Sequence, residues 1–286
     1  MGYFPSASPS VPPVQSAVFF KRQSALSYKL LGVALLVCIS GCSFPTDAEP
    51  FSPSTAEAFT LLGVSFPNPI ETTQPVNPTI TLSFSDVLDS DTGSLVTIRA
   101  GSRGTPAELL LEHNLVERKL LVRPKSNLTI NTEFQLDIGT SLRSLAGVPL
   151  DKGTRLTFRT GANVLPPVTE TPLVLADVIG SKGQLKSYCA ATTCHSAKYE
   201  PAARGLDLSD ATPAIRNHLV SASATGSPEG LRLVQPMQPE KSYLLRKLLA
   251  GRGFTRIMGS SMPVDSVPIP ADALLSVQAW IRQGAN

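Results

Sequence analysis

Hydrophobic and polar residues alternate along residues 58–161 of the chain. From Thr79 to Phe84 every second residue is apolar, which places Ile80, Leu82 and Phe84 on one face of a strand. Six further short apolar runs are separated by Gly, Asp, Asn and Pro: Leu61–Phe66, Leu95–Arg99, Leu109–Glu112, Arg118–Val122, Glu133–Ile138 and Arg155–Phe158. About seven short strands in a hundred residues predict an all-β, immunoglobulin-like sandwich.

After residue 172 the apolar positions follow a helical period. In Pro270–Gly284 the residues Leu274, Val277, Trp280 and Ile281 share one helical face. Proline opens this predicted helix and glycine closes it. Two further helices are predicted, Gln184–Cys189 and Pro239–Ala250. We therefore expect residues 173–286 to form a second, mainly α domain.

Segments without periodicity flank the predicted sandwich. Residues 42–57 and 162–172 are rich in proline and small polar residues, which favours an extended tether and an extended linker. Upstream, basic residues precede the apolar run Leu30–Ile39, and no acidic residue occurs before Asp47. This is the pattern of a secretory signal, because ten apolar residues are too few to span a bilayer. Residues 1–41 are therefore predicted to be a signal peptide.

The end of this signal, Ile39-Ser40-Gly41-Cys42, resembles the lipobox of bacterial lipoproteins. The resemblance implies that Cys42 is acylated and anchors the protein in a membrane. Two or three acyl chains would make that anchor durable. The expected location is the cell envelope, at the outer membrane, with the protein facing the periplasm or the surface. The alternative is an ordinary signal peptide that contains a cysteine.

The charge of the chain is a further guide to partners. Removal of the signal would remove three basic residues, Lys21, Arg22 and Lys29, and would leave 22 basic and 22 acidic residues. A net charge near zero without a basic cluster predicts no nucleic-acid partner.

The strongest chemical motif is Cys189-Ala-Ala-Thr-Thr-Cys194-His195. Two thiols can add to the two vinyl groups of one porphyrin, and the adjacent histidine can then ligate the iron. The usual motif has two residues between the cysteines, whereas this one has four. In an exported chain the same cysteines could form a disulfide loop instead, or part of a zinc site.

A haem iron in an electron carrier takes a second axial ligand from the protein. His195 is the predicted proximal ligand. Met262 is the predicted distal ligand, because a thioether opposite an imidazole stabilises Fe(II). Met258, Met237 and His218 are its competitors.

Several stretches of the first domain resemble bacterial Ig-like domains of the SbsA type. These stretches are Pro75–Asp89, Asn127–Leu136, Ser144–Leu150 and Leu156–Thr160. The resemblance implies a spacer or a binding module of a surface protein. His113 is expected to be a solvated loop residue of this domain rather than a ligand.

The second domain resembles the cytochrome c-like domains of surface lipoproteins from myxobacteria. Four matches follow the haem motif in order: Gly205–Leu208, Pro239–Leu244, Met262-Pro263 and Trp280–Ala285. The resemblance implies one covalent haem c. The chain departs from the pattern in its four-residue cysteine gap and at Gln235–Gln238, where the family often has a Pro-Gly-Asp turn.

Together these features predict a lipid-anchored electron carrier rather than an enzyme. An iron with two protein ligands has no free position for a substrate, so single-electron transfer to and from a redox partner protein is the expected activity. The alternative is a surface scaffold or adhesion lipoprotein whose cytochrome-like domain lacks haem. A redox enzyme subunit with an open iron is a third possibility.

Overall fold

The computed structural model describes residues 58–89, 95–179, 183–189, 195, 206–224, 227, 229–250, 257, 260–263 and 268–286. All of them belong to one unit of the chain, Phe44–Asn286. The signal peptide, the tether, Cys42, Cys194 and Met258 lie outside the described residues.

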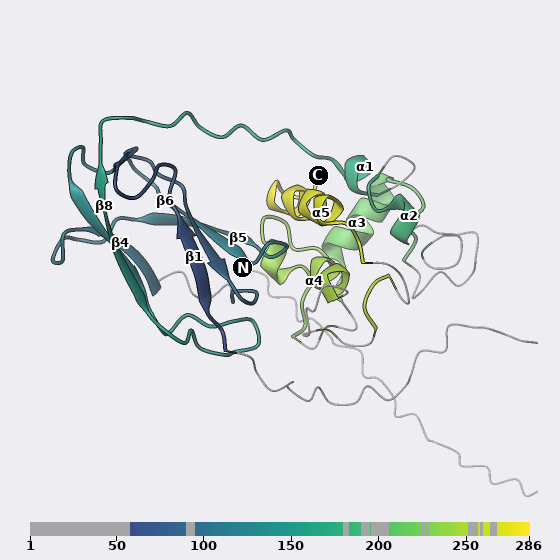
Figure 1. The fold of residues 1–286 in the computed structure, drawn as a ribbon. Helices are drawn as coiled ribbons and strands as arrows, with labels where there is room; N and C mark the ends of the chain where they lie inside the picture. Colours follow the sequence, from purple (N-terminus) through teal and green to yellow (C-terminus); the bar gives the residue numbers. More distant parts are fainter. Residues whose placement is uncertain are drawn as a thin grey trace, which may run out of the picture. The chain divides into compact units, whose positions relative to one another are not determined.

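The first part of the chain forms two four-stranded sheets that face each other (Figure 1). One sheet has the order β1-β3-β6-β5, and its strands are antiparallel: β1 (Leu61–Ser65), β3 (Ile80–Phe84), β6 (Lys119–Pro124) and β5 (Leu109–Asn114). The other has the order β2-β8-β7-β4: β2 (Thr73–Gln74), β8 (Thr154–Thr160), β7 (Glu133–Ile138) and β4 (Val96–Ala100). In that sheet β2 runs parallel to β8, and the other pairs are antiparallel.

The core between the sheets comes from the alternation seen in the sequence. Ile80, Leu82 and Phe84 of β3 are buried, and the side chains between them are half-buried. Because successive side chains of a strand point to opposite faces, this register places every apolar residue of β3 inside. Phe59 stacks on Phe84 with ring centroids 5.4 Å apart.

All seven predicted strands are present in the structure, with ends that differ by a few residues.

Two details of the sandwich differ from the prediction. The strand β2 was not predicted, because a two-residue strand has no period to detect. His113 is half-buried within β5 and does not lie in a solvated loop. The pairing of β5 with β6 continues through His113–Leu120 and Asn114–Lys119, so the strand is longer than its apolar run. Burial lowers the pKa of His113, against a smaller opposing effect of Asp89.

The second part of the described chain is helical. Its helices are α1 (Leu175–Val178), α2 (Lys186–Cys189), α3 (Pro213–Ser221), the 3₁₀ helix η3 (Pro239–Lys241), α4 (Tyr243–Leu249) and α5 (Ala271–Arg282). The segment predicted as one helix over Pro239–Ala250 is divided at Ser242. The Ser242 hydroxyl donates to the Gln238 carbonyl and accepts from the Gln235 N–H. Such side-chain bonds compete with helical ones, which accounts for the break.

Helix α5 buries the predicted face, since Leu274, Val277, Trp280 and Ile281 are fully buried. It ends at Arg282, and Gly284 just beyond its C-cap has a φ of +104°, which suits glycine. The Trp280 indole N–H and the Leu175 N–H donate to the same Asn286 oxygen, each at 2.9 Å. This shared acceptor ties α1 to α5.

Three sandwich residues belong to the same hydrophobic cluster as the helices: Val87, Leu115 and Leu145. The Leu115 N–H donates to the Gln278 side-chain oxygen over 2.9 Å, and this bond is buried. Arg282 of α5 pairs with Glu112 of β5 and with Glu170 of the linker. The sandwich and the helices are therefore joined by apolar packing, a buried hydrogen bond and ion pairs.

The predicted linker is extended, with no helix or strand over residues 161–174. Its first residues are held to the sandwich, because Asn77 exchanges two hydrogen bonds with the Leu165 main chain, at 2.9 and 2.7 Å. At the other end the Leu173 N–H donates to the Gln283 side chain. The linker is thus fixed near both ends.

Candidate functional site

Cys189 is the last residue of α2 and is buried, with 7% of its surface exposed. Helix α2 follows α1 closely, and the Leu185 N–H donates to the Val178 carbonyl over 2.9 Å. The Cys189 N–H donates in turn to the Leu185 carbonyl, also over 2.9 Å. The packing of Val178 and Leu185 in the hydrophobic cluster therefore fixes the position of Cys189 at its edge.

His195 is half-buried and is held at two points. Its Nδ1 lies 2.9 Å from the Leu206 carbonyl oxygen, and its own carbonyl accepts from the Leu208 N–H over 2.8 Å. A carbonyl can only accept, so Nδ1 is the donor, and in the neutral ring Nε2 would carry the lone pair. Metal-ligating histidines almost always make this kind of bond, because it fixes the tautomer and the ring orientation.

Met262 is half-buried and packs against the hydrophobic cluster that contains Cys189. Its main-chain N–H donates to the Lys247 carbonyl of α4 over 3.2 Å. Two of its three competitors are exposed: Met237 has 72% of its surface in solvent, and His218 lies on the exposed side of α3. Met262 is therefore the best placed of the described candidates for an apolar site.

Three predicted site residues lie in one hydrophobic cluster, pack against it, or are hydrogen-bonded to residues that pack there. Cys189 is part of it, Met262 packs on it, and His195 is bonded to the segment Leu206–Leu208, whose leucines also pack in or on it. In the described parts of the chain, no three His, Cys, Asp or Glu side chains come together to hold a bare metal ion. Haem makes a smaller demand, because the porphyrin supplies four ligands and the protein supplies only the axial ones.

The sequence motifs do not indicate the acceptor for the His195 ring. The Leu206 carbonyl is a main-chain group 11 positions along the chain, and no side-chain type marks such a role. The available signal was the Leu206-Asp207-Leu208 alternation, which predicts a short extended segment able to pair with another stretch of main chain.

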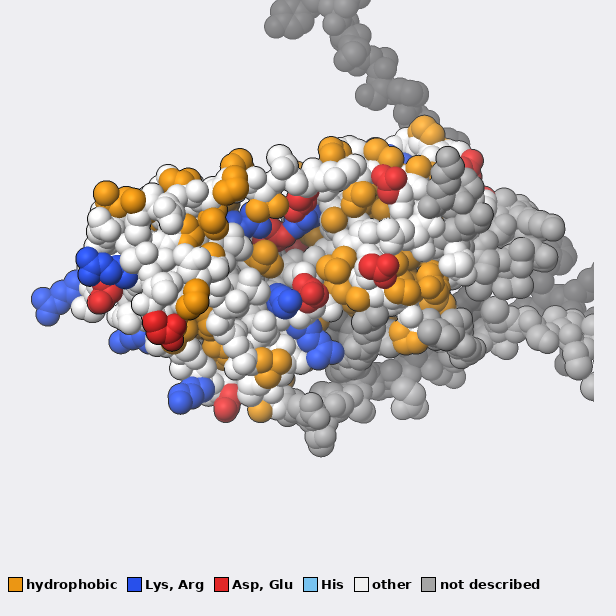
Figure 2. Space-filling view, turned by 45° about the horizontal axis from the view of Figure 1, so that its top comes forward, with side chains coloured by type: hydrophobic (Ala, Val, Ile, Leu, Met, Phe, Trp, Pro, Cys, Tyr) orange, Lys and Arg blue, Asp and Glu red, His pale blue; other side chains and the backbone are white. Residues whose placement is uncertain are grey.

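The surface of the described chain is mixed in charge. On the face shown in Figure 2, basic and acidic side chains are interspersed, with hydrophobic ones between them. None of the helices that the structure describes is long and apolar enough to cross a membrane.

Comparison with solved structures finds weak similarities. Part of Escherichia coli alpha-2-macroglobulin, spanning domains MG0-NIE-MG1, aligns with 22% identity; the alignment covers 37% of this chain and 33% of that chain, with a TM-score of 0.28. The N-terminal part of the bacterial S-layer protein SbsC aligns with 12% identity, 43% of this chain, 27% of that chain and a TM-score of 0.28. The chain thus spans a third or less of these structures. No curated protein matches it significantly.

The family comparison agrees with the strands and motifs of the first domain. Residues 56–160 match the profile of the bacterial Ig-like domain. This match covers the two sheets from β1 to β8. Residues 56–160 are therefore a bacterial Ig-like domain.

Proposed function

We propose that this protein is a lipid-anchored electron carrier. Cys42 would hold the anchor, and the helical segment would be a c-type cytochrome domain with one haem. Cys189 and Cys194 would attach the haem, and His195 and Met262 would ligate its iron. The Ig-like domain would act as a spacer or a binding module.

The observation that carries this proposal is the hydrogen bond from His195 Nδ1 to the Leu206 carbonyl. With Nδ1 as the donor, Nε2 would be the ligating atom, and the bond orients the ring, which a histidine of an ordinary surface loop does not require. The second bond, from the Leu208 N–H to the His195 carbonyl, fixes the main chain beside the ring. These two bonds support the assignment of His195, the residue after the second cysteine of the motif, as the axial ligand.

The surroundings of Cys189 and Met262 suit a haem edge. The Cys189 side chain lies in the hydrophobic cluster, and the half-buried Met262 side chain packs against it. A covalent haem would supply an iron that accepts and releases one electron. The residues of the chain would hold it by thioether bonds, ligate it and keep it dry, and a methionine ligand would favour the reduced state.

The cellular location is proposed from two independent features. The signal and the lipobox-like sequence before Cys42 indicate export and acylation. A bacterial Ig-like domain suggests an extracellular or surface protein. Both features favour a place in the cell envelope, at the outer membrane.

The decisive experiment is haem staining after denaturing electrophoresis. The full-length protein is produced together with a haem-attachment system that accepts four residues between the cysteines. Thioether-linked haem should remain on the wild-type chain and be absent when Cys189 and Cys194 are both replaced by serine. Failure of the wild-type chain to take up haem would refute the electron-transfer function.

The axial ligand is tested separately. Met262→Ala should keep the haem but lose the weak sulfur-to-iron absorption band of the oxidised protein, and its reduction potential should fall. Met237→Ala is the matched control, because this methionine is exposed and should affect neither property. If Met262→Ala leaves both the band and the potential unchanged, the assignment of Met262 is wrong.

A non-redox surface scaffold or adhesion lipoprotein is the second candidate function. The match of residues 56–160 to a bacterial Ig-like domain favours it, since the two sheets bury a hydrophobic core of their own. The haem-staining experiment distinguishes the two, because a scaffold would stay colourless and folded under the same conditions.

A further inference from the structure

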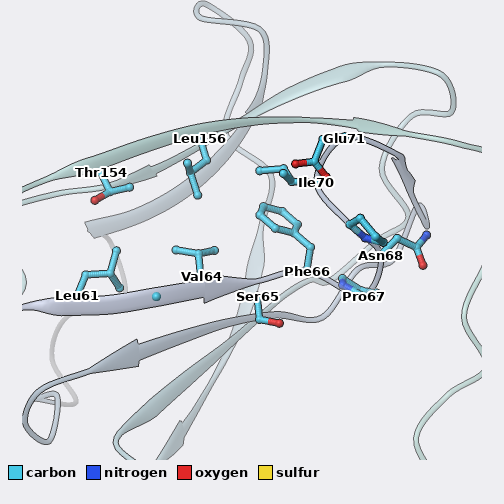
Figure 3. Close-up of a pocket in the computed structure, with 12 residues that line it drawn as sticks. Leu61, Val64, Ser65, Phe66, Pro67, Asn68, Ile70, Glu71, Thr154 and Leu156 are labelled. Atoms are coloured by element: carbon cyan, nitrogen blue, oxygen red, sulfur yellow. The ribbon is translucent and has the colours of Figure 1, made fainter.

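A groove of about 770 Å³ opens between the two sheets of the Ig-like domain. Figure 3 shows Leu61, Val64 and Phe66 on one side of it and Thr154 and Leu156 on the other. The first group comes from β1 and the residue after it, and the second comes from β8. The floor between these two strands is formed by Leu61, Val64, Phe66 and Leu156, and the polar side chains of Ser65, Asn68 and Glu71 also line the groove.

Strand β8, which lines the groove with Thr154 and Leu156, has an open main-chain edge. Strand β2 pairs with β8 only at Arg159 and Thr160, so it leaves the earlier part of β8 uncovered. The Thr160 N–H donates to Thr132 on the β7 side, and the next N–H, of Gly161, donates to Gln74 on the other side. Main-chain groups alternate in this way along a strand, so every second residue points away from β7. Arg155 and Thr157 are two of these residues. In the described residues no strand pairs with them on that side.

The opposite wall is also a sheet edge. Strand β1 is the first strand of its sheet and pairs only with β3 among the described strands. The groove therefore combines an apolar floor with open strand edges on both sides. Open edges carry rows of N–H and C=O groups that another extended chain can satisfy.

We propose that this groove binds an extended segment of a partner polypeptide by β-strand addition to β8. The main-chain groups of Arg155 and Thr157 would supply the hydrogen bonds, and apolar side chains at alternate positions would enter the groove. Among the lining residues Glu71 alone carries a charge, so the segment would bear a basic residue opposite it. The occupant is a peptide, because only a polypeptide main chain can both hydrogen-bond to the open edge of β8 and direct alternate side chains into the groove.

The geometry also gives the length and direction of the segment. Residues 154–158 of β8 extend over about 16 Å, enough to pair with five residues. Glu71 precedes β2, which pairs with the far end of β8, and Figure 3 places Glu71 at the end of the groove away from Thr154. In an antiparallel arrangement the basic residue would therefore stand at the N-terminal end of the bound segment.

The probe is a fluorescein-labelled peptide of sequence Lys-Thr-Val-Thr-Val, whose lysine and valines share one face, titrated into the full-length protein and followed by anisotropy. Binding should be saturable, and a peptide N-methylated at its two threonines should not bind. Thr157→Pro removes one N–H from the open edge and should weaken binding about tenfold or more. Thr157→Val keeps the N–H and is the matched control with unchanged affinity.

Two further variants separate binding from folding. Leu156→Ala removes apolar floor without altering the edge and should weaken binding several-fold. Glu71→Gln should weaken it about two- to fivefold and reduce its dependence on salt. Thermal unfolding of each variant shows whether the domain remains folded.

The proposal is overturned if the peptide does not bind, or if folded Thr157→Pro and Leu156→Ala bind it like the wild type. Sedimentation of the protein without peptide tests the other occupant. A concentration-dependent dimer that Thr157→Pro abolishes would assign the groove to a second copy of the chain and also overturn the proposal.

Discussion

Replacing Gln278 with methionine should destabilise the whole protein by weakening the contact between the sandwich and the helices. Gln278 is 4% exposed, and its side-chain oxygen accepts the buried N–H of Leu115. Methionine has similar length and fills similar space, but it offers the Leu115 N–H only a weak sulfur acceptor. The substitution therefore isolates the hydrogen bond from the packing.

The expected magnitude follows from the burial of this bond. A buried N–H left without a good acceptor costs about 1–3 kcal/mol in the free energy of unfolding. For a chain of this size each kcal/mol lowers the melting temperature by about 2–4 °C. The effect is large enough for urea or thermal unfolding to detect.

The assay compares two probes of unfolding. Fluorescence reports on Trp280, the single tryptophan of the chain, which lies in α5, while circular dichroism in the β region reports on the sandwich. Ser276→Ala is the control on the same helix, because the Ser276 hydroxyl bonds only within α5, to the Asp272 carbonyl. It should change the free energy by no more than about 0.5 kcal/mol.

The two transitions together show whether the Leu115–Gln278 contact couples the stability of the sandwich to that of the helices. If the contact couples the two parts, Gln278→Met should shift both transitions to lower urea. A shift of the fluorescence transition alone would show that the sandwich does not depend on the helices. No shift in either probe would show that the Leu115–Gln278 bond contributes nothing to stability.

Three further predictions concern separate parts of the chain. His113→Gln should reduce the loss of stability below pH 6.5. The pKa of His113 is lowered from 6.5 in the folded protein, so on acidification the unfolded chain takes up the proton first, which favours unfolding. The free energy of unfolding falls through this effect by at most about 1.4 kcal/mol per pH unit. Parallel pH profiles of urea unfolding for the variant and the wild type would contradict this prediction. Gly284→Ala should cost about 1–2 kcal/mol because its φ is positive, and an unchanged urea midpoint would be inconsistent with that strain. Cys42→Ser should release the protein from membranes and abolish labelling with a fatty-acid precursor, whereas continued acylation would place the anchor elsewhere.

The strands were predictable because burial of one face imposes a period of two. Ile80, Leu82 and Phe84 show that period in the sequence and are buried in the structure. The two residues of β2 show no period, so only their tertiary pairing with β8 defines them. Helix α3 could have been found, since Thr212-Pro213 has the cap and the proline of a helix start, and the Thr212 hydroxyl does accept from the Ile215 N–H.

The site was predictable only as far as side-chain chemistry marks it. Cys189, His195 and Met262 were selected by type and spacing, and the structure relates them to one apolar cluster. The Leu206 carbonyl that orients His195 is a main-chain group, so its role depends on tertiary structure. The burial of Leu115 against α5 was unpredictable for the same reason, because it depends on a partner 163 positions away.

The linker between the sandwich and the helices is a place where the chain could be cut without separating these two parts. It is held at Leu165 by Asn77 and at Glu170 by Arg282, and between them it is exposed, with 74% of the Val168 surface in solvent. Exposed extended segments are preferred sites of proteolytic cleavage and of tolerated insertion. A cut near Val168 would therefore leave two fragments whose own contacts hold them together. The chain could be divided there for split-protein labelling, with the sandwich and the helices produced as separate but associating pieces.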